Sequence, residues 1–204
     1  MTCVLLAMMP ATAVLAAKDR PYRIAGAQRG PDKEWVPVDV MEQANRGVAC
    51  QIRYLAPEAR TDALKSAVNS SMELFPGRAA EKNGHPGYIV FVLEMANQTT
   101  EDVMFNPGQA RMVTEKGDMK FPLDYTAVHE RLSSLGPGAP EVDEVAAAVF
   151  DRTVTLRPGG SVRKLLVFDA PREDTFKTIQ VRLHEINVGT EDIGFLFPFR
   201  KFFE

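Results

Sequence analysis

The chain has 204 residues, enough for one domain with a hydrophobic core plus an appended element, and too few for two domains of ordinary size. Hydrophobic residues make up 45% and charged residues 25%, which is the balance of a folded protein and excludes a disordered one. The formal net charge of -3 predicts no basic stripe, so we expect neither nucleic acid nor an acidic lipid surface as a partner.

The first 17 residues have the outline of an export signal. They carry no charged side chain, are mostly apolar, and end at the charged run that starts at Lys18. Val14 and Ala16 are the small residues required before a cleavage site after Ala16, and Ala17 offers a second choice. We predict a signal peptide at 1–17 and a periplasmic or extracellular protein; the alternative is a buried N-terminal helix. No Lys or Arg precedes the apolar run, which suggests a translation start further upstream.

Cysteine usage agrees with export. Cys3 would leave with the signal peptide, so the mature chain keeps only Cys50 and forms no intramolecular disulfide. Cys50 lies in the apolar run 48–52, where a lone thiol is usually a small buried residue. The alternative is a reactive or intermolecularly paired thiol.

The N-terminal part of the mature chain predicts little regular structure at first. Residues 18–34 are rich in Arg, Pro and Gly without a clear period, so we predict an extended leader. A small strand-helix unit follows at 35–84. Its predicted elements are an edge strand at 35–40, demoted to an edge by Pro37, a strand at 48–55, an amphipathic helix at 57–68 and a loop at 75–87.

The chain from residue 85 to 204 has the pattern of a β-sandwich. Residues 88–94 are apolar on both parities, which predicts a central strand covered on both faces. Short strands at this spacing, separated by turn residues and with almost no helix, favour an antiparallel immunoglobulin-like sandwich, mainly β. The other predicted elements are a strand at 103–105, a hairpin of 111–114 and 119–123 around Gly117, a helix at 125–135, and strands at 145–156, 162–168, 176–188 and 193–199.

Residues 158–161 read Pro-Gly-Gly-Ser and precede Lys164, which raises the question of a phosphate-binding loop. Such a loop needs a second glycine before its lysine and a following helix whose N-terminus holds the phosphates. Here the second glycine is missing and an apolar strand run, 165–168, follows. We therefore predict a hairpin turn after Leu156, in which the glycines supply positive φ angles.

Several of these stretches resemble one known family. Residues 156–168, a strand end, a Pro-Gly turn and a strand ending in Val-Phe, lead into an Asp-Ala-Pro break at 169–171. This order resembles a segment of the telokin-like, immunoglobulin-like domains of exported bacterial envelope proteins. Residues 87–99, ending in Asn-Gln-Thr, are similar to the strand that opens those domains, and 112–121 resembles their hairpin. The resemblance spans about 85–199 and implies an immunoglobulin-like sandwich.

Two parts of the chain depart from the family pattern: the helical stretch at 125–135 and the unit at 35–84. The resemblance rests on turns and apolar positions and includes no catalytic residue. It implies an envelope-associated binding or accessory module. We therefore expect an exported, non-catalytic binding or scaffolding protein without a cofactor, whose partner is an envelope protein or a cell-surface component.

Two fragments begin like the metal motif of zinc proteases, at His129 and at His184, each followed by Glu. Both lack the second histidine that must lie one helical turn further on to share the metal. The sequence therefore predicts no zinc site.

A copper site is the main alternative from another class. Met104, Met112 and Met119 fall in neighbouring predicted strands beside His129. Thioethers together with an imidazole are the ligands that Cu(I) selects, so these four residues make a periplasmic copper-binding carrier the alternative function. Ordinary core methionines that fill gaps in a sandwich explain the same residues.

An unrecognised hydrolase is a further alternative. The chain has no G-x-S-x-G nucleophile elbow, and Cys50 has no histidine near it in the sequence. The carboxylates Glu141, Asp143 and Glu144 are typical of a solvated loop or a helix start. We therefore assign no catalytic residue.

The C-terminal residues combine aromatic and cationic side chains. Phe195, Phe197 and Phe199 share one face of a strand, which we expect to be the core face. Phe202 and Phe203 then lie beyond the strand end beside cations, where exposed aromatics often mark a partner contact. The alternative is that they fold back and cap the open end of the sandwich.

Overall fold

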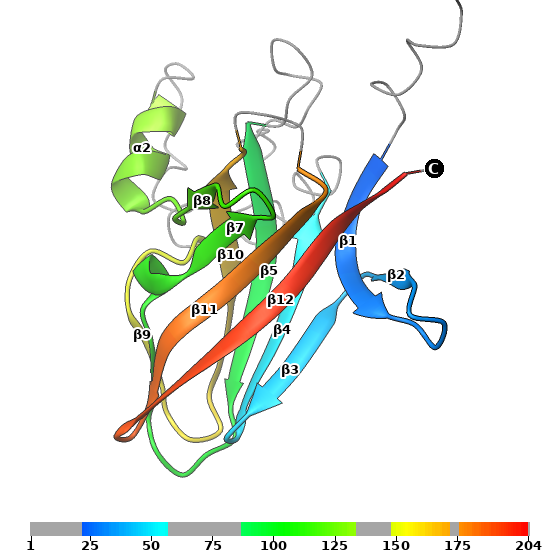
Figure 1. The fold of residues 1–204 in the computed structure, drawn as a ribbon. Coiled ribbons are helices and arrows are strands. Elements are labelled where there is room, and N and C mark those ends of the chain that lie inside the picture. The colour runs from blue at the N-terminus through cyan, green and yellow to red at the C-terminus, as the bar shows by residue number, and fades with distance from the viewer. Residues whose placement is uncertain (1–21, 57–86, 134–147, 172–175, 204) are drawn as a thin grey trace, which may run out of the picture.

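Two antiparallel β-sheets pack face to face in the protein (Figure 1), whose computed structural model describes residues 22–56, 87–133, 148–171 and 176–203. The prediction of a mainly β, antiparallel fold is confirmed. Helix α2 (Tyr125–Ser133) confirms the helical stretch expected near 125–135. No helix in the described ranges is long and apolar enough to cross a membrane.

The eight-stranded sheet, sheet A, is built around the long hairpin of β11 and β12. In spatial order its strands are β2 (Trp35–Val38), β1 (Tyr22–Arg29), β12 (Glu191–Phe203), β11 (Thr178–Val188), β6 (Val103–Phe105) and β9 (Val154–Leu156), while β7 (Arg111–Thr114) pairs with β11 and with β8 (Met119–Lys120). A short 3-10 helix, η2 (Pro107–Gln109), connects β6 to β7. The edge position of β2, with Pro37 in it, and the β7–β8 hairpin with Gly117 at φ +84° were both predicted and are confirmed.

The four-stranded sheet, sheet B, has the order β10 (Ser161–Asp169), β5 (Tyr88–Asn97), β4 (Val48–Leu55) and β3 (Met41–Asn45). Strand β5 is an inner strand of this sheet, and residues 89–93 are buried on both parities. The prediction of a central strand covered on both faces is therefore confirmed.

The main core lies between the two sheets and is rich in phenylalanine. The ring of Phe91 on β5 lies 4.7 Å from the ring of Phe199 on β12 and 6.1 Å from that of Phe168 on β10. Burying such a side chain contributes roughly 1.5–3 kcal/mol, so these rings are a major source of the free energy that holds the sheets together. Cys50 lies in the same core with 1% of its surface exposed, and this burial raises the pKa of its thiol to about 12. The prediction of a small buried residue is confirmed.

A second, smaller apolar cluster covers part of the outer face of sheet B. Val90 and Val92 of β5 point to this face, and Val128 of α2 packs in the same cluster. The cluster explains why β5 is apolar on both parities. Its other buried members are Leu55, Leu123, Val149, Leu165 and Val167.

The N-terminal strands join the same two sheets. Residues 22–29, within the segment 18–34 for which we predicted an extended leader, form β1, which pairs with β12 from Tyr22 opposite Phe203 to Gly26 opposite Phe199. The prediction missed this strand because residues 24–27, Ile-Ala-Gly-Ala, are all buried and show no alternation of apolar and polar side chains. Strands β3 and β4 likewise pair into sheet B. The predicted signal peptide at 1–17 and the helix at 57–68 lie outside the described residues.

The Pro-Gly-Gly-Ser stretch is a turn followed by a strand, as expected, but it is not a hairpin. The N–H of Gly160 donates to the carbonyl oxygen of Arg157 (2.8 Å), and Gly159 has φ +76°. The strand before the turn, β9, belongs to sheet A, whereas β10 after it belongs to sheet B. The turn therefore carries the chain from one sheet to the other. Of the strand predicted at 145–156, β9 supplies only its last three residues, and residues up to 147 are not described.

Asn97 at the end of β5 ties the nearby turns together. Asn97 is 1% exposed, and both the amide nitrogen and the amide oxygen of its side chain form two hydrogen bonds. Its Nδ2 donates to the carbonyl oxygens of Glu101 (2.7 Å) and Leu156 (2.8 Å), and its Oδ1 accepts from the N–H (2.8 Å) and the hydroxyl (2.7 Å) of Thr99. A buried amide with these bonds fixes the β5–β6 turn against β9 of the same sandwich.

Candidate functional site

Four arginines lie on the outer face of sheet A, the face turned away from the core. The odd-numbered residues of β12 from 193 to 201 are buried, so its even-numbered residues point outward, and the strand registers extend this parity to β1, β11 and β7. We call the surface formed by Arg23, Arg111, Arg182 and Arg200 the arginine face. The outward positions of the described segments 23–27, 111–113, 178–182 and 194–202 include these four arginines and no carboxylate. This concentration departs from the expectation of no basic stripe, because a net charge averages over every face of a protein.

Two members of the arginine face lie directly opposite each other. Arg182 on β11 is the cross-strand partner of Arg111 on β7. The guanidinium of Arg182 donates from Nε (3.2 Å) and Nη2 (2.8 Å) to Oε1 of Gln180. This acceptor is a neutral amide, so it fixes the guanidinium without neutralising its charge.

Arg111 is held in place in a similar way. Its Nη1 donates to the carbonyl oxygens of Gly108 and Ala110 (both 2.8 Å), and its Nη2 donates to Oε1 of Gln109 (3.0 Å). Its guanidinium carbon lies 4.0 Å from the centre of the Phe121 ring, which is a cation–π contact. Every one of these partners is uncharged, so Arg111 keeps its positive charge in a fixed position.

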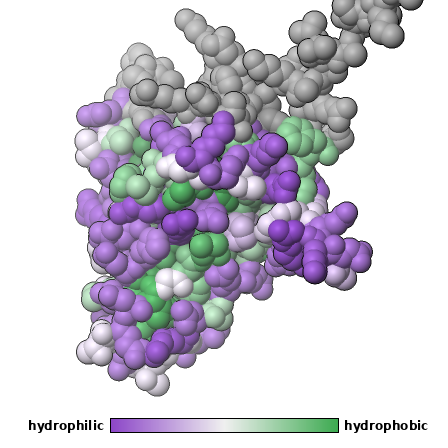
Figure 2. Space-filling model, in the orientation of Figure 1, coloured by the Kyte–Doolittle hydropathy of each residue, from purple (hydrophilic) through white to green (hydrophobic). Residues whose placement is uncertain are grey.

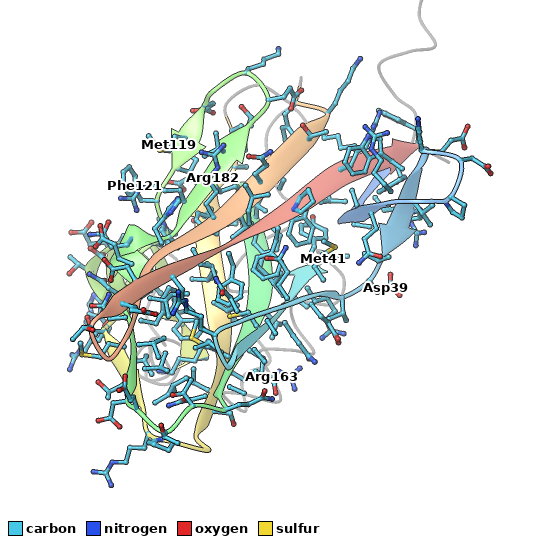
Figure 3. The ribbon with its side chains drawn as sticks, turned by 60° about the horizontal axis from the view of Figure 1, so that its bottom comes forward. Asp39, Met41, Met119, Phe121, Arg163 and Arg182 are labelled. Carbon is cyan, nitrogen blue, oxygen red and sulfur yellow. The ribbon has the colours of Figure 1, made fainter. Side chains whose placement is uncertain are left out.

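Exposed apolar side chains flank this pair. Phe121 is 52% exposed, Met119 is 51% exposed, and Leu196, the β12 partner of Arg182, is 43% exposed. Figure 3 shows Met119, Phe121 and Arg182 on the same part of sheet A. Figure 2, drawn from the side of β11 and β12, shows hydrophobic side chains scattered among hydrophilic ones on this face. Arginine, aromatic and methionine side chains are enriched in protein interfaces relative to the rest of the surface.

Glu115, at the end of β7, uses its carboxylate to join the β7–β8 hairpin to β11. The N–H groups of Lys177 (2.5 Å) and Thr178 (2.8 Å) donate to its two oxygens. Burial alone would raise the pKa of Glu115, but the hydrogen bonds from these backbone N–H groups outweigh it and lower the pKa. The carboxylate is therefore bound to the backbone at the strand end.

The four predicted copper ligands are not brought together. Met112 is fully buried in the core, whereas Met104 and Met119 are exposed on the outer face of sheet A. Through the strand registers, Met104 lies beside Asn187 of β11 and Met119 lies in line with residue 180, roughly 20 Å away at about 3.3 Å per residue. His129 is exposed on α2, the helix that covers sheet B. Within the described ranges, no three His, Cys, Asp or Glu side chains gather as a metal site.

We predicted that Phe202 and Phe203 lie beyond the end of the last strand, and this prediction is wrong. Strand β12 continues to Phe203 because β1 pairs with it, which places Phe202 opposite Arg23 and Phe203 opposite Tyr22. Phe202 is half-buried on the outer face of sheet A next to the arginine face, and Phe203 is exposed. Their role as partner contacts stays a prediction.

The residues considered for catalysis give no assembled site. Cys50 is buried with a raised pKa, which keeps its thiol protonated and unreactive. The carboxylates at 141–144 lie outside the described residues. The hydrolase alternative therefore gains no residues from the described part of the chain.

An open hollow of about 350 Å³ lies at the end of the sandwich where several turns meet. Arg46, in the β3–β4 turn, forms an ion pair with Glu191 across this region. The Glu101 carboxylate lies so close to Gly189 that a Cβ there would be 1.8 Å from its Oε2. Arg46 is paired with Glu191, so this hollow, unlike the arginine face, offers no arginine without a counter-charge among the described residues.

Arg111 and Arg182 were not among the residues selected from the sequence. One signal was available: the alternation from Ile179 to His184 places Arg182 on the wet face of its strand. The position of Arg111 opposite Arg182 depends on the pairing of β7 with β11. The two arginines are 71 residues apart in the sequence (182 − 111), so no local pattern shows that they are neighbours in the sheet.

Comparison with known proteins assigns no family. No protein-family model matches the chain, and no curated protein matches it. Among solved structures, it is similar to the yjhA protein from Bacillus subtilis, with 12% identity, a TM-score of 0.36, and coverage of 53% of this chain and 72% of that one. It is also similar to a functionally unknown protein from Listeria monocytogenes EGD-e, with 11% identity, a TM-score of 0.38, and coverage of 88% of this chain and 86% of that one.

Proposed function

We propose that the protein is an exported, non-catalytic envelope module with an immunoglobulin-like sandwich, and that it binds a protein partner through the outer face of sheet A. The export proposal rests on the signal-like residues 1–17. The immunoglobulin-like proposal rests on the resemblance at about 85–199 and agrees with two packed antiparallel sheets.

One observation carries the binding proposal: fixed arginines and exposed large apolar side chains lie together on one face. Phe121, Met119 and Leu196 surround the Arg111–Arg182 pair and are each about half exposed. Covering these exposed apolar side chains with a partner would remove them from water, which favours binding. Arginine and aromatic residues also dominate the binding energy of known interfaces.

The binding proposal is tested by photo-cross-linking in the cells that produce the protein. A photoreactive amino acid replaces Leu196 on the outer face of sheet A, or Gln51, an exposed residue on the outer face of sheet B. We expect a discrete cross-linked protein from position 196 and none from position 51. Equal products from both positions, or none from position 196, would contradict the proposal.

Export is tested separately by fractionating those cells and measuring the mass of the protein. We expect the protein outside the cytoplasm, with its N-terminus at Ala17 or Lys18. Intact protein that retains residues 1–17 in the cytoplasm would contradict export and would leave the binding proposal to be judged on the cross-linking alone.

A further inference from the structure

The Arg111–Arg182 pair has an unusual electrostatic arrangement. Directly opposite residues on antiparallel strands have Cα atoms about 4.5–5.5 Å apart, and like charges at such positions repel each other. On the outer face of sheet B, by contrast, residues of opposite charge face each other: Arg163 of β10 lies opposite Glu94 of β5. Among the described residues, the cross-strand neighbours of Arg182 are Arg111 and Leu196, so the arginine pair has no counter-charge at these positions.

Both guanidiniums also keep donors for a further partner. A guanidinium has five N–H donors. Arg182 uses the N–H of Nε and one N–H of Nη2 toward Gln180, which leaves both N–H groups of Nη1 and the other N–H of Nη2 without a hydrogen bond within the described part of the chain. Arg111 uses both N–H groups of Nη1 and one N–H of Nη2, so its Nε–H and the other N–H of Nη2 donate to no group in the described ranges. The free donors and the uncompensated charge lie on the same side of the sheet.

We propose that Arg111 and Arg182 together bind a carboxylate side chain of an acidic protein partner. A carboxylate has two oxygens with about four acceptor sites, so one carboxylate accepts from both guanidiniums at once. The planar fork of arginine matches this geometry, and Gln180 and Gln109 hold the two forks before the partner arrives. Binding would replace the repulsion between the arginines with two charge-assisted contacts.

The apolar neighbours indicate that the carboxylate belongs to a protein. Leu196 lies on the β12 side of Arg182, and Phe121 lies against Arg111. A partner segment in which an acidic residue is flanked by apolar residues matches this order of side chains. This inference rests on the proposed function, since it names the chemistry by which the same face recognises its partner.

The test uses a synthetic acetylated peptide in which Glu, Leu and Ser repeat, with a control peptide in which Gln replaces Glu. Binding to the full mature protein is followed by NMR through the arginine Nε–H signals, at low and at high salt. We expect saturable shifts of Arg111 and Arg182 with the acidic peptide, weakened by salt, and none with the control peptide. Arg182→Gln should weaken binding roughly tenfold, the value of one charge-assisted hydrogen bond. Arg163→Gln, the same charge change on sheet B, should leave it unaltered.

Arg182→Glu provides the second variant, because it places opposite charges across the pair and should preserve the fold while abolishing peptide binding. Unchanged binding in Arg182→Glu, or equal loss in Arg163→Gln, would overturn the inference. Binding to phosphatidylglycerol vesicles without binding to the acidic peptide would also overturn it, since the ligand would then be a phosphate.

If cross-linking from position 196 persists while the acidic peptide fails to bind, the carboxylate inference fails and the proposed function stands. If both fail, the proposed function fails as well.

Discussion

Arg111 of β7 and Arg182 of β11 face each other across neighbouring strands, and each guanidinium is fixed by uncharged oxygens. Sheet stability alone would favour an opposite-charge pair at these positions. A local arrangement that costs folding free energy is typical of functional surfaces, where selection for binding outweighs selection for stability.

The arginine pair predicts a gain of stability when one charge is reversed. Arg182→Glu should raise the free energy of unfolding by about 0.5–1 kcal/mol, because attraction to Arg111 replaces repulsion. Urea denaturation at low salt measures the change. Arg163→Glu is the matched control with the opposite expected sign, since it would place a carboxylate opposite Glu94. Destabilisation by both variants would contradict the account of the pair.

Asn97 should be essential for the turn cluster at the end of the sandwich. Asn97→Ala removes four hydrogen bonds and leaves the buried carbonyl oxygen of Leu156 without the donor that Asn97 provides, so we expect a loss of at least about 2 kcal/mol in the free energy of unfolding. Chemical denaturation provides the measurement. The exposed neighbour Gln98 is the control, and Gln98→Ala should change stability by less than about 0.5 kcal/mol. Equal effects of the two variants would contradict the structural role of Asn97.

Cys50 should be unreactive in the folded protein. Its burial raises the pKa of the thiol to about 12, so thiolate is scarce at neutral pH, and the core blocks access as well. We expect modification by a thiol reagent at pH 8 to be roughly a hundredfold or more slower in the native protein than in guanidinium-unfolded protein. Rapid stoichiometric modification of the native protein would show instead that the thiol is accessible.

Glu115 predicts an acid-sensitive contact. Its pKa in the folded protein is lowered from the ordinary value of 4.5, so its contribution to stability is complete above pH 4.5 and is lost as the pH falls through the folded pKa. The measurement is the thermal unfolding midpoint of the wild type and of Glu115→Gln at each pH from 7 to 3. We expect the wild type to be the more stable at pH 7 and the difference to shrink below pH 4.5. A difference independent of pH would rule out this carboxylate as the cause.

Local sequence pattern was sufficient to predict three elements. Strand β5 was identified from its apolar run, the β7–β8 hairpin from Gly117, and α2 from its helical spacing. These features depend on neighbours in the sequence. Strand β1 was missed because residues 24–27 show no alternation of apolar and polar side chains. The extension of β12 to Phe203 was missed because it depends on pairing with β1.

The arginine face shows the same limit for the candidate site. The alternation in β11 exposes Arg182, yet its meaning comes from Arg111 opposite, and that pairing depends on strand order. The copper ligands failed for a related reason: Met112 and Met119 lie in one hairpin but on opposite faces of the sheet, so closeness in the sequence did not bring their sulfurs together.

The most direct test of the central claim is cross-linking from position 196 in two charge-reversed backgrounds. Arg182→Glu changes the arginine face, and Arg163→Glu makes the same charge reversal on sheet B. Both arginines are labelled in Figure 3. We predict that the cross-linked protein disappears in the Arg182→Glu background and persists in the Arg163→Glu background. Equal yields in both backgrounds would contradict the claim that the arginine face binds the partner.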